Sequence, residues 1–289
     1  MFIGNKEFNT ENNVYIMGIL NCTPDSFSDG GEFNDIDKAL FHTEKMIKDG
    51  ASIIDVGGES TRPGYTKISE DEEIQRIVPI IEKINANFDT VISVDTYKSV
   101  VAKEAIKAGA SLVNDIWGCK YDNNMAKIIA ENNIACCLMH NRDIETNPYK
   151  ISLDNFNGNN TNISEINPEK YDIIDEVLSD LKGSIEIAIN AGINKDKIIL
   201  DPGIGFAKNY EQNLSVMKNL ERIKELGYPI LLGTSRKSMI RLALNLPKEE
   251  RLEGTIATSV MGVVKGCSFI RVHDVLENKR AVDMTKLIK

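Results

Sequence analysis

The sequence predicts an α/β protein, a single (β/α)₈ TIM barrel with its active site at the carboxyl-terminal face of the strands. Short β-branched runs alternate with longer amphipathic stretches along the whole chain, as in βα units on a parallel sheet. Eight units can be counted in 289 residues, close to the roughly 250 residues typical of this barrel. Nearly every predicted strand also ends in a polar residue, which is where active sites of this fold are built.

The predicted strands are short, apolar and rich in Ile and Val. They span Tyr15 to Leu20, Ser52 to Val56, Val91 to Val94, Leu112 to Asn114, Ala135 to Met139, Ile198 to Leu200, Ile230 to Leu232 and Phe269 to Val272. The predicted helices between them carry apolar residues at helical spacing, so one face of each packs on the sheet. They span Ile36 to Lys48, Glu70 to Asn85, Ser99 to Ala108, Met125 to Asn132, Asp172 to Asn190 and Tyr210 to Leu226.

A doubly wound open sheet is the alternative architecture, but the Gly-rich dinucleotide fingerprint that it often carries is missing after the first strand. We therefore expect one domain over residues 1–289 with three excursions. These are loop 1 over residues 22–34, expected to be mobile, loop 2 over residues 57–68, and an Asn-rich loop over residues 141–167. The composition of the last of these resists packing.

Charge and composition exclude several classes of protein. A formal net charge of −9 argues against a nucleic-acid-binding surface, because such a surface needs a positive field. No run approaches the roughly 18 apolar residues of a membrane span, and the amino terminus has no secretory pattern, so a cytoplasmic protein is expected. The five cysteines show no C-x-x-C spacing and are expected to be buried free thiols.

The polar residues at the strand ends divide into two groups. Any one of them could simply cap the following helix, but so many together favour a site. Early in the chain, Asp95, Asn114 and Asp201 offer hydrogen-bond acceptors and an amide, which suit a flat heterocycle with several N–H donors. Late in the chain, cations and hydroxyls follow strands seven and eight, where barrels commonly bind phosphate. This second group comprises Ser235, Arg236, Lys237, Arg271 and His273.

Metal binding is expected to involve a hard cation. The three histidines are not at zinc-ligand spacing. Mg²⁺ needs only one or two protein oxygens when substrate phosphates supply the others, so Asn21 can serve as a ligand.

Several segments resemble dihydropteroate synthases. MGILNCTPDSFSDGG (17–31) and DVGGESTRPG (55–64) are similar to the two signature segments of that family. The similarity continues, in order, through SVDT (93–96), VNDI (113–116), LMH (138–140), LDPGIGF (200–206), GTSRKS (233–238) and IRVHD (270–274). It therefore covers nearly the whole chain, and no fused pyrophosphokinase domain is expected.

The resemblance implies a transferase of folate biosynthesis. It would join p-aminobenzoate to 6-hydroxymethyl-7,8-dihydropterin pyrophosphate, release pyrophosphate and form 7,8-dihydropteroate, with Mg²⁺ on the pyrophosphate. Pyrophosphate would leave early, and the aryl amine would attack a pterin cation. The resemblance also implies a homodimer paired through late helices, and competition by sulfonamides at the p-aminobenzoate subsite.

The resemblance also assigns roles by position. The pterin residues are Asp95, Asn114, Met139, Asp201, Phe206 and Lys237. The p-aminobenzoate residues are Phe27, Thr61, Arg62, Pro63 and Ser238. The pyrophosphate residues are Asn21, Arg271 and His273, with Asn21 also on the metal. The catalytic residues are Asp29, Asp95, Asp201 and Lys237, with Phe27 and Asp29 brought in by closure of loop 1.

Two other functions are compatible with the same fold and pterin pocket. One is a methyltransferase that uses a reduced folate, which would not need the residues that serve pyrophosphate and an aryl amine. The other is a noncatalytic pterin-binding relative, which would be expected to lose loop or phosphate residues. Both sets of residues are present here.

Overall fold

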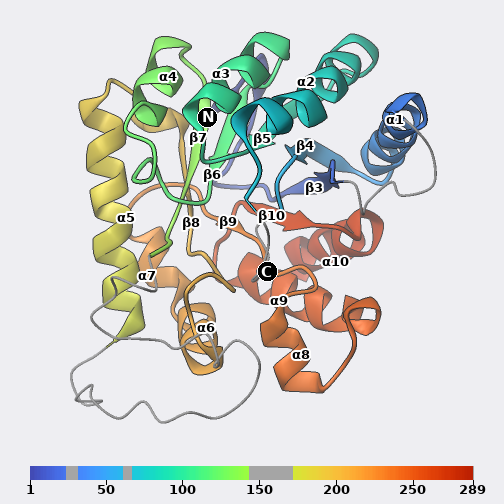
Figure 1. The fold of residues 1–289 in the computed structure, drawn as a ribbon. Helices are drawn as coiled ribbons and strands as arrows, with labels where there is room; N and C mark the ends of the chain where they lie inside the picture. Colours follow the sequence, from blue (N-terminus) through green and yellow to red (C-terminus); the bar gives the residue numbers. More distant parts are fainter. Residues whose placement is uncertain (24–31, 61–66, 143–171, 289) are drawn as a thin grey trace.

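The computed structural model describes residues 1–23, 32–60, 67–142 and 172–288, and these ranges form a barrel of parallel strands surrounded by helices (Figure 1). The barrel strands are β3 (Tyr15–Asn21), β4 (Ala51–Gly57), β5 (Val91–Asp95), β6 (Leu112–Asp115), β7 (Ala135–Met139), β8 (Ile198–Asp201), β9 (Leu231–Leu232) and β10 (Phe269–Val272). They are paired in the order β8-β7-β6-β5-β4-β3-β10-β9. A parallel bridge between Leu200 and Ile230 joins the two ends, so the barrel prediction is confirmed over the open sheet.

Helices follow the strands in the alternation that the sequence predicts. They are α1 (Glu32–Lys48), α2 (Glu70–Asn87), α3 (Ser99–Ala108), α4 (Met125–Glu131), α5 (Ile173–Asn190), α6 (Tyr210–Lys218), α7 (Leu220–Lys224), α8 (Ser238–Leu244), α9 (Leu252–Val264) and α10 (Val275–Ile288), with short 3-10 turns at Lys195–Lys197 and Lys248–Glu250. The single helix expected over Tyr210 to Leu226 is wrong, because Asn219 leaves the helical conformation (φ −113°, ψ 22°) and separates α6 from α7.

Two predicted loops are shorter than expected. Helix α1 begins at Glu32, so residues 32–34 are helical and not part of loop 1. Strand β4 continues through Gly57, so loop 2 begins one residue later than predicted. Residues 24–31, 61–66 and 143–171 lie outside the described ranges, which leaves the rest of both loops, and almost all of the predicted Asn-rich excursion, as predictions.

Five strands, β3, β4, β5, β6 and β8, are one residue longer than predicted at their carboxyl ends, and three of them end in a residue assigned to the site. Asn21, Asp95 and Asp201 are the last residues of β3, β5 and β8. The prediction stopped before them because they are polar, but each is paired within the sheet. Asn21 lies opposite Gly57, Gly57 opposite Asp95, and Asp201 opposite Met139. The pairing therefore brings these side chains to one end of the barrel.

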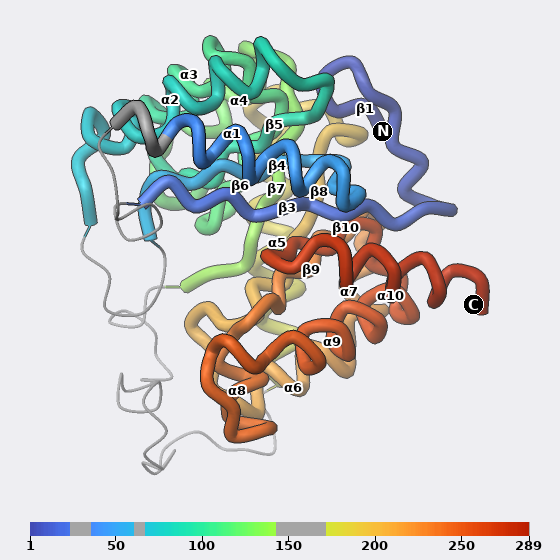
Figure 2. The backbone as a smooth tube through the Cα atoms, turned by 90° about the vertical axis from the view of Figure 1, so that its right-hand side faces the viewer, coloured from blue at the N-terminus to red at the C-terminus, as the bar shows by residue number. Residues whose placement is uncertain are grey.

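The other end of the barrel is filled with apolar side chains. A hairpin of β1 (Phe2–Ile3) and β2 (Lys6–Glu7) precedes the barrel, and its residue Ile3 is fully buried with Phe8 and Phe269. The Phe8 and Tyr15 rings meet edge to face with centroids 4.8 Å apart. Both chain termini lie on the same side of the molecule (Figure 2). Among the described residues, no helix is long and apolar enough to cross a membrane.

Candidate active site

The carboxyl end of the barrel gathers most of the residues that the sequence assigns to the site. Asn21, Asp95, Asn114, Met139 and Asp201 lie at the ends of β3, β5, β6, β7 and β8, and Arg271 lies in β10. Phe206, Ser235, Lys237, Ser238 and His273 follow β8, β9 and β10. Five assigned residues, Phe27, Asp29, Thr61, Arg62 and Pro63, lie outside the described ranges.

Arg271 lies at the centre of this end, between two carboxylates. Its Nε donates to Asp55 Oδ2 at 2.6 Å, and its Nη2 donates to Asp95 Oδ2 at 2.6 Å. Asn114 Nδ2 also donates to Asp55 Oδ2, at 3.1 Å. Arg271 was assigned to pyrophosphate alone, yet two of its donor nitrogens are held by carboxylates, one from Asp95, which was assigned to the pterin, and one from Asp55, which was not assigned. Arg271 therefore links the two halves of the site.

Asp55 is a site residue that the sequence reasoning missed. It is completely buried inside β4, where its neighbours Ile54 and Val56 are apolar. A carboxylate within an otherwise apolar strand is costly unless it is paired with a cation. The run Ile53 to Val56 contains that signal, but the site was predicted only from residues at strand ends.

Burial shifts the pKa values of the ionisable groups in opposite directions. It raises the pKa of Asp95 to about 7, with the positive charge of Arg271 as the main opposing influence. It also raises the pKa of Asp201, against the opposing charge of Lys237. Burial lowers the pKa of Lys237 to about 8, against the opposing charges of Asp201 and Asp95. These carboxylates and this ammonium are thus partly desolvated and face one another.

Some buried oxygen atoms in this region have no hydrogen-bond partner among the described residues. They are Oδ1 of Asp55, Oδ1 of Asp95 and Oγ of Ser93. An unpaired buried acceptor costs free energy, so a native structure that keeps several together commonly uses them for a ligand. A carboxylate oxygen accepts hydrogen bonds, so the missing partner of Asp95 is an N–H or O–H donor.

One wall of the site is formed by the turn after β8. Asp201 Oδ1 accepts a hydrogen bond from the Gly203 backbone N–H at 2.7 Å. Phe206 is half-buried and packs with Met139 in a small apolar cluster. The Lys237 ammonium lies 4.6 Å from the centroid of the Phe206 ring, and its Nζ donates to the Ile204 carbonyl. An acceptor, a flat apolar ring and a cation thus line the same wall.

The late-strand group is oriented by its own hydrogen bonds. Ser235 Oγ accepts from the His273 backbone N–H at 3.2 Å and lies 2.9 Å from His273 Nδ1. Which of these two atoms donates depends on the tautomer of the ring. Arg236 makes a two-point ion pair with Asp274 at 3.0 and 2.5 Å. Arg236 was expected to belong to the anion-binding group, but it braces the loop.

Two polar residues predicted at the strand ends are bound by buried lysines that the sequence reasoning did not identify. Lys98 Nζ lies 2.7 Å from Glu59 Oε2 and 2.7 Å from Glu73 Oε2. His140 is fully buried, and its Nδ1 lies 2.6 Å from Lys208 Nζ. Lys98 follows the segment SVDT (93–96) and Lys208 follows LDPGIGF (200–206). The local sequence pattern alone does not distinguish a buried Lys from an exposed one.

The donors near Asn21 suit a hard cation. Within the described ranges, no group of three or more His, Cys, Asp or Glu side chains is arranged to hold a metal. Mg²⁺ does not require one, because it keeps water and phosphate ligands and takes one or two protein oxygens. Asn21 supplies an amide oxygen at the end of β3, next to β10, which carries Arg271. The residues therefore fit Mg²⁺ bound together with a phosphate ligand.

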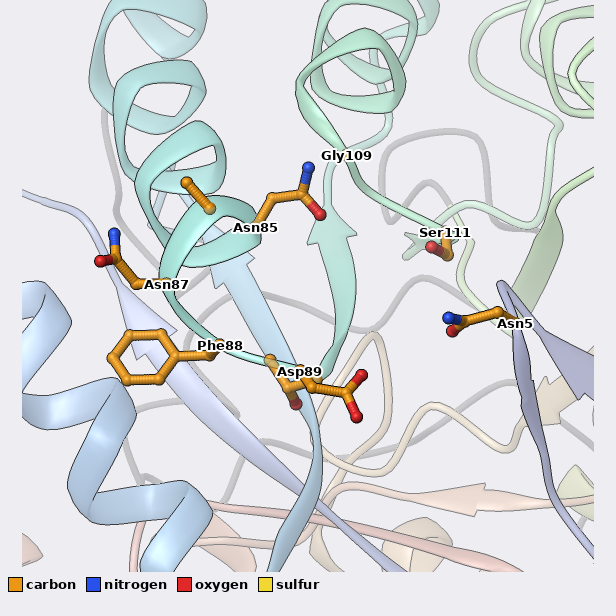
Figure 3. A pocket seen from close by; sticks show the side chains of 9 residues that line it. Asn5, Asn85, Asn87, Phe88, Asp89, Gly109 and Ser111 are labelled. Atoms are coloured by element: carbon orange, nitrogen blue, oxygen red, sulfur yellow. The ribbon is translucent and has the colours of Figure 1, made fainter.

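A polar hollow of about 550 Å³ lies far from these groups. Asn5, Asn85, Asp89 and Ser111 are among the residues that line it (Figure 3). They stand at the end of α2 and just before β5 and β6, which is the end of the barrel where strands begin. Active sites of this fold lie at the opposite end, so this hollow is not the candidate site.

The chain is similar to known pterin-binding proteins. Residues 17–273 match the family model described as pterin binding enzyme. A dihydropteroate synthase of Clostridium beijerinckii is 60% identical over 289 residues, which covers 100% of this chain and 99% of the relative. A crystal structure of the Clostridium difficile dihydropteroate synthase in the presence of pteroic acid matches with a TM-score of 0.87 and 48% identity, over 98% of this chain and 99% of that one.

A second solved structure is the Yersinia pestis dihydropteroate synthase in complex with a sulfonamide drug. It matches with a TM-score of 0.86 and 36% identity, over 100% of this chain and 98% of that one. The chain therefore belongs to the pterin-binding enzymes and, within them, to the dihydropteroate synthases, which are transferases of folate biosynthesis.

Proposed function

We propose that this enzyme forms 7,8-dihydropteroate with the residues described above in two roles, recognition of the pterin and capture of pyrophosphate. The observation that carries the proposal is the pair of buried carboxylates, Asp55 and Asp95, each with an unpaired oxygen and both joined to Arg271. Such a group is costly without a ligand. A pterin ring, with several N–H donors on one edge, supplies the missing partners.

The pterin half of the site is assigned to the early strands and the turn after β8. Asp95, Asn114 and Asp201 would hydrogen-bond the ring N–H groups. Met139 and Phe206 would contact the ring faces, since both belong to the apolar cluster beside these carboxylates. Lys237 would donate to a ring carbonyl oxygen or nitrogen, a role that its ammonium, 4.6 Å from the Phe206 ring centroid, supports.

The phosphate half is assigned to Arg271, His273 and Asn21. Arg271 is held by two carboxylates and His273 by Ser235, so both are positioned before the substrate binds. Positioned donors stabilise a leaving anion without reorganisation at the moment of reaction. Mg²⁺, held by Asn21 and the substrate phosphates, would neutralise charge on the leaving pyrophosphate.

A third part of the site, the p-aminobenzoate subsite, is assigned to Phe27, Thr61, Arg62, Pro63 and Ser238. Of these residues, only Ser238 lies in the described ranges. We propose that the C–O bond to pyrophosphate breaks early and that the aryl amine attacks the resulting pterin cation. A C–N bond forms and the amine nitrogen loses one proton. The carboxylates of Asp95, Asp201 and, from loop 1, Asp29 would stabilise the cation. An aromatic amine is neutral near pH 7, so no strong general base is needed.

We further propose that the enzyme works in the cytoplasm as a homodimer paired through its late helices. Helices α8 to α10 expose large apolar side chains, which is unusual for a surface without a partner. They are Leu242, Leu244, Met261, Val264, Met284, Leu287 and Ile288. Sedimentation of the purified protein tests the dimer, and a monomer at micromolar concentration would contradict it.

The direct test of the reaction uses the purified protein with dihydropterin pyrophosphate, p-aminobenzoate and Mg²⁺. Dihydropteroate is expected as product, and sulfonamides are expected to compete with p-aminobenzoate. Pterin binding without product would favour a noncatalytic relative, and methyl transfer from a reduced folate would favour the methyltransferase. Lys237→Ala is expected to weaken pterin binding, whereas Asp29→Ala is expected to lower turnover and leave pterin binding nearly intact.

A further inference from the structure

Lys208 is a buried lysine that the mechanism above does not use. Its side chain is only 3% exposed. The ammonium donates to the Gly203 carbonyl at 2.9 Å and to the Phe206 carbonyl at 3.2 Å, and it lies 2.6 Å from His140 Nδ1. An ammonium has three N–H donors. These three acceptors therefore use all of them.

Two of these acceptors belong to the irregular turn after β8. Gly203 and Gly205 have φ values of +68° and +81°, a conformation that suits glycine. An ideal Cβ on Gly203 would stand 2.0 Å from the His140 carbonyl oxygen, so the turn lies directly against the end of β7. With both carbonyls pointing at one ammonium, Lys208 ties the beginning of the turn to its end.

The third partner of Lys208 is His140, and burial lowers the pKa of both groups. A neutral imidazole accepts at Nδ1 only when its proton is on Nε2. Burial, and secondly the charge of Lys208, lower the pKa of His140 to about 3, so the ring stays a neutral acceptor. His140 Nε2 lies 3.8 Å from Glu176 Oε1, and Glu176 is itself bound to Arg142. At that distance His140 Nε2 makes no hydrogen bond to Glu176, so His140 anchors the centre to the end of β7.

The turn that Lys208 holds carries two groups of the pterin wall. The N–H of Gly203 binds Asp201 Oδ1 at 2.7 Å and so orients that carboxylate. Phe206 lies at the other end of the turn, under the Lys237 ammonium. A change in the turn would therefore move the acceptor and the ring together.

We propose that Lys208 is a positioning residue for the pterin, acting with His140 to hold the turn 203–206 in the conformation that presents Asp201 and Phe206. The inference rests on the proposed pterin subsite. If Lys208 had only a structural role, its loss would lower the stability of the whole fold and would not weaken pterin binding specifically.

Lys98 provides the matched control. It is also buried and donates to three acceptors, Glu59, Glu73 and the Ile68 carbonyl, of which Glu59 and Ile68 lie at the two ends of loop 2 and Glu73 lies in α2. Lys208→Met and Lys98→Met each remove one buried ammonium and keep most of the side-chain volume. If the proposal holds, they differ in which substrate they affect.

The experiment measures the dissociation constant of 6-hydroxymethyl-7,8-dihydropterin pyrophosphate by calorimetry, with thermal unfolding of each variant followed in parallel. Lys208→Met is expected to weaken pterin binding at least about tenfold, with the KM for p-aminobenzoate changed less than about twofold. Lys98→Met is expected to leave the pterin constant within about twofold. Unchanged pterin affinity in Lys208→Met, or equal weakening in both variants, would overturn the proposal.

A second variant covers the case in which Lys208→Met does not fold. His140→Leu keeps the ammonium and both carbonyl contacts but removes the third acceptor, and a pterin constant raised about threefold or more is expected. Wild-type affinity in His140→Leu would then overturn the proposal. The wild-type protein distinguishes this proposal from the proposed function. If wild-type protein binds the pterin but forms no dihydropteroate, the proposed function is rejected. The role of Lys208 is then still tested by the same pterin titration of the variants.

Discussion

The two ends of the barrel are built from the same eight strands and differ completely in their chemistry. At the end where strands begin, Ile3, Phe8 and Phe269 fill the interior with apolar surface. At the end where strands finish, Asp55, Asp95 and Arg271 bury three charges in contact with one another. Apolar burial stabilises the fold directly. For buried charges, the attraction between the paired groups at most offsets the free-energy cost of removing them from water.

The difference shows that stability and function are separated along the barrel axis. Only the polar end holds buried oxygens without partners next to titratable groups with shifted pKa values, within the ranges that the structure describes. Sites that bind ligands commonly violate the rules that stabilise the remainder of a fold. Substitutions at the apolar end should therefore lower stability and leave activity nearly unchanged, whereas substitutions at the polar end should lower activity and leave stability nearly unchanged.

The largest effect is expected at the apolar end. Phe269→Ala removes a fully buried ring that packs between Phe8 and Tyr15. It should lower the free energy of unfolding by about 3–5 kcal/mol, because a cavity remains. Chemical denaturation measures the loss, and the KM values at 25 °C should stay within about twofold of wild type.

Its control is Phe41→Ala, at a residue of α1 that is 71% exposed. That change should cost no more than about 0.5 kcal/mol. A marked rise in the pterin KM of Phe269→Ala would show that the two ends are coupled.

The second prediction concerns the polar end, where a substitution should lower activity without lowering stability. Asp201→Asn keeps an oxygen for the Gly203 N–H but removes a carboxylate whose pKa burial raises. The kcat/KM should fall about 100-fold, corresponding to about 2.7 kcal/mol of lost transition-state stabilisation. The melting temperature should stay equal or rise, because a desolvated charge is gone. A large fall in melting temperature with wild-type kcat/KM would reverse the assignment.

The same contrast explains what the sequence could predict. Strand and helix order follow from local periodicity, which the apolar residues carry, so the barrel was predictable within a residue or two at most boundaries. The polar residues at strand ends were also visible. Asp55 carried a local signal, a carboxylate inside an apolar strand, but its partner Arg271 is 216 positions away. Lys98 and Lys208 carried none, because Glu73 and His140, which show that these lysines are buried and paired, are 25 and 68 positions away.

The third prediction concerns loop 2. Lys98 donates to Glu59 and to the Ile68 carbonyl, so it joins the two ends of the segment that contains Thr61 and Arg62. Lys98→Met should raise the KM for p-aminobenzoate about tenfold. Glu73→Gln, which keeps a hydrogen-bonding side chain beside Lys98, serves as the milder control. A tenfold rise in the KM for the pterin substrate alone would contradict the assignment of Lys98 to the p-aminobenzoate subsite.

The smallest effect is the pH dependence that Lys237 introduces. Burial lowers the pKa of Lys237 from 10.5 to about 8. The ammonium that would contact the pterin is thus present below about pH 8 and lost above it. Pterin affinity should fall a few-fold between pH 7.5 and pH 9.5, and calorimetry over that range measures it. Asp95 faces the same group, and because burial raises its pKa to about 7 it finishes ionising at the lower edge of this range. Lys237→Met, which keeps Asp95, separates the two titrations.

Stability should change in the opposite direction over the same range. Between about pH 8 and pH 10.5 the unfolded chain binds the Lys237 proton and the folded chain does not, so this group makes the free energy of unfolding rise with pH. Lys237→Met should remove both slopes, leaving weaker but flatter pterin binding and a lower dependence of unfolding on pH. A pterin affinity that falls equally steeply in Lys237→Met would assign the titration to another group and leave Lys237 without this role.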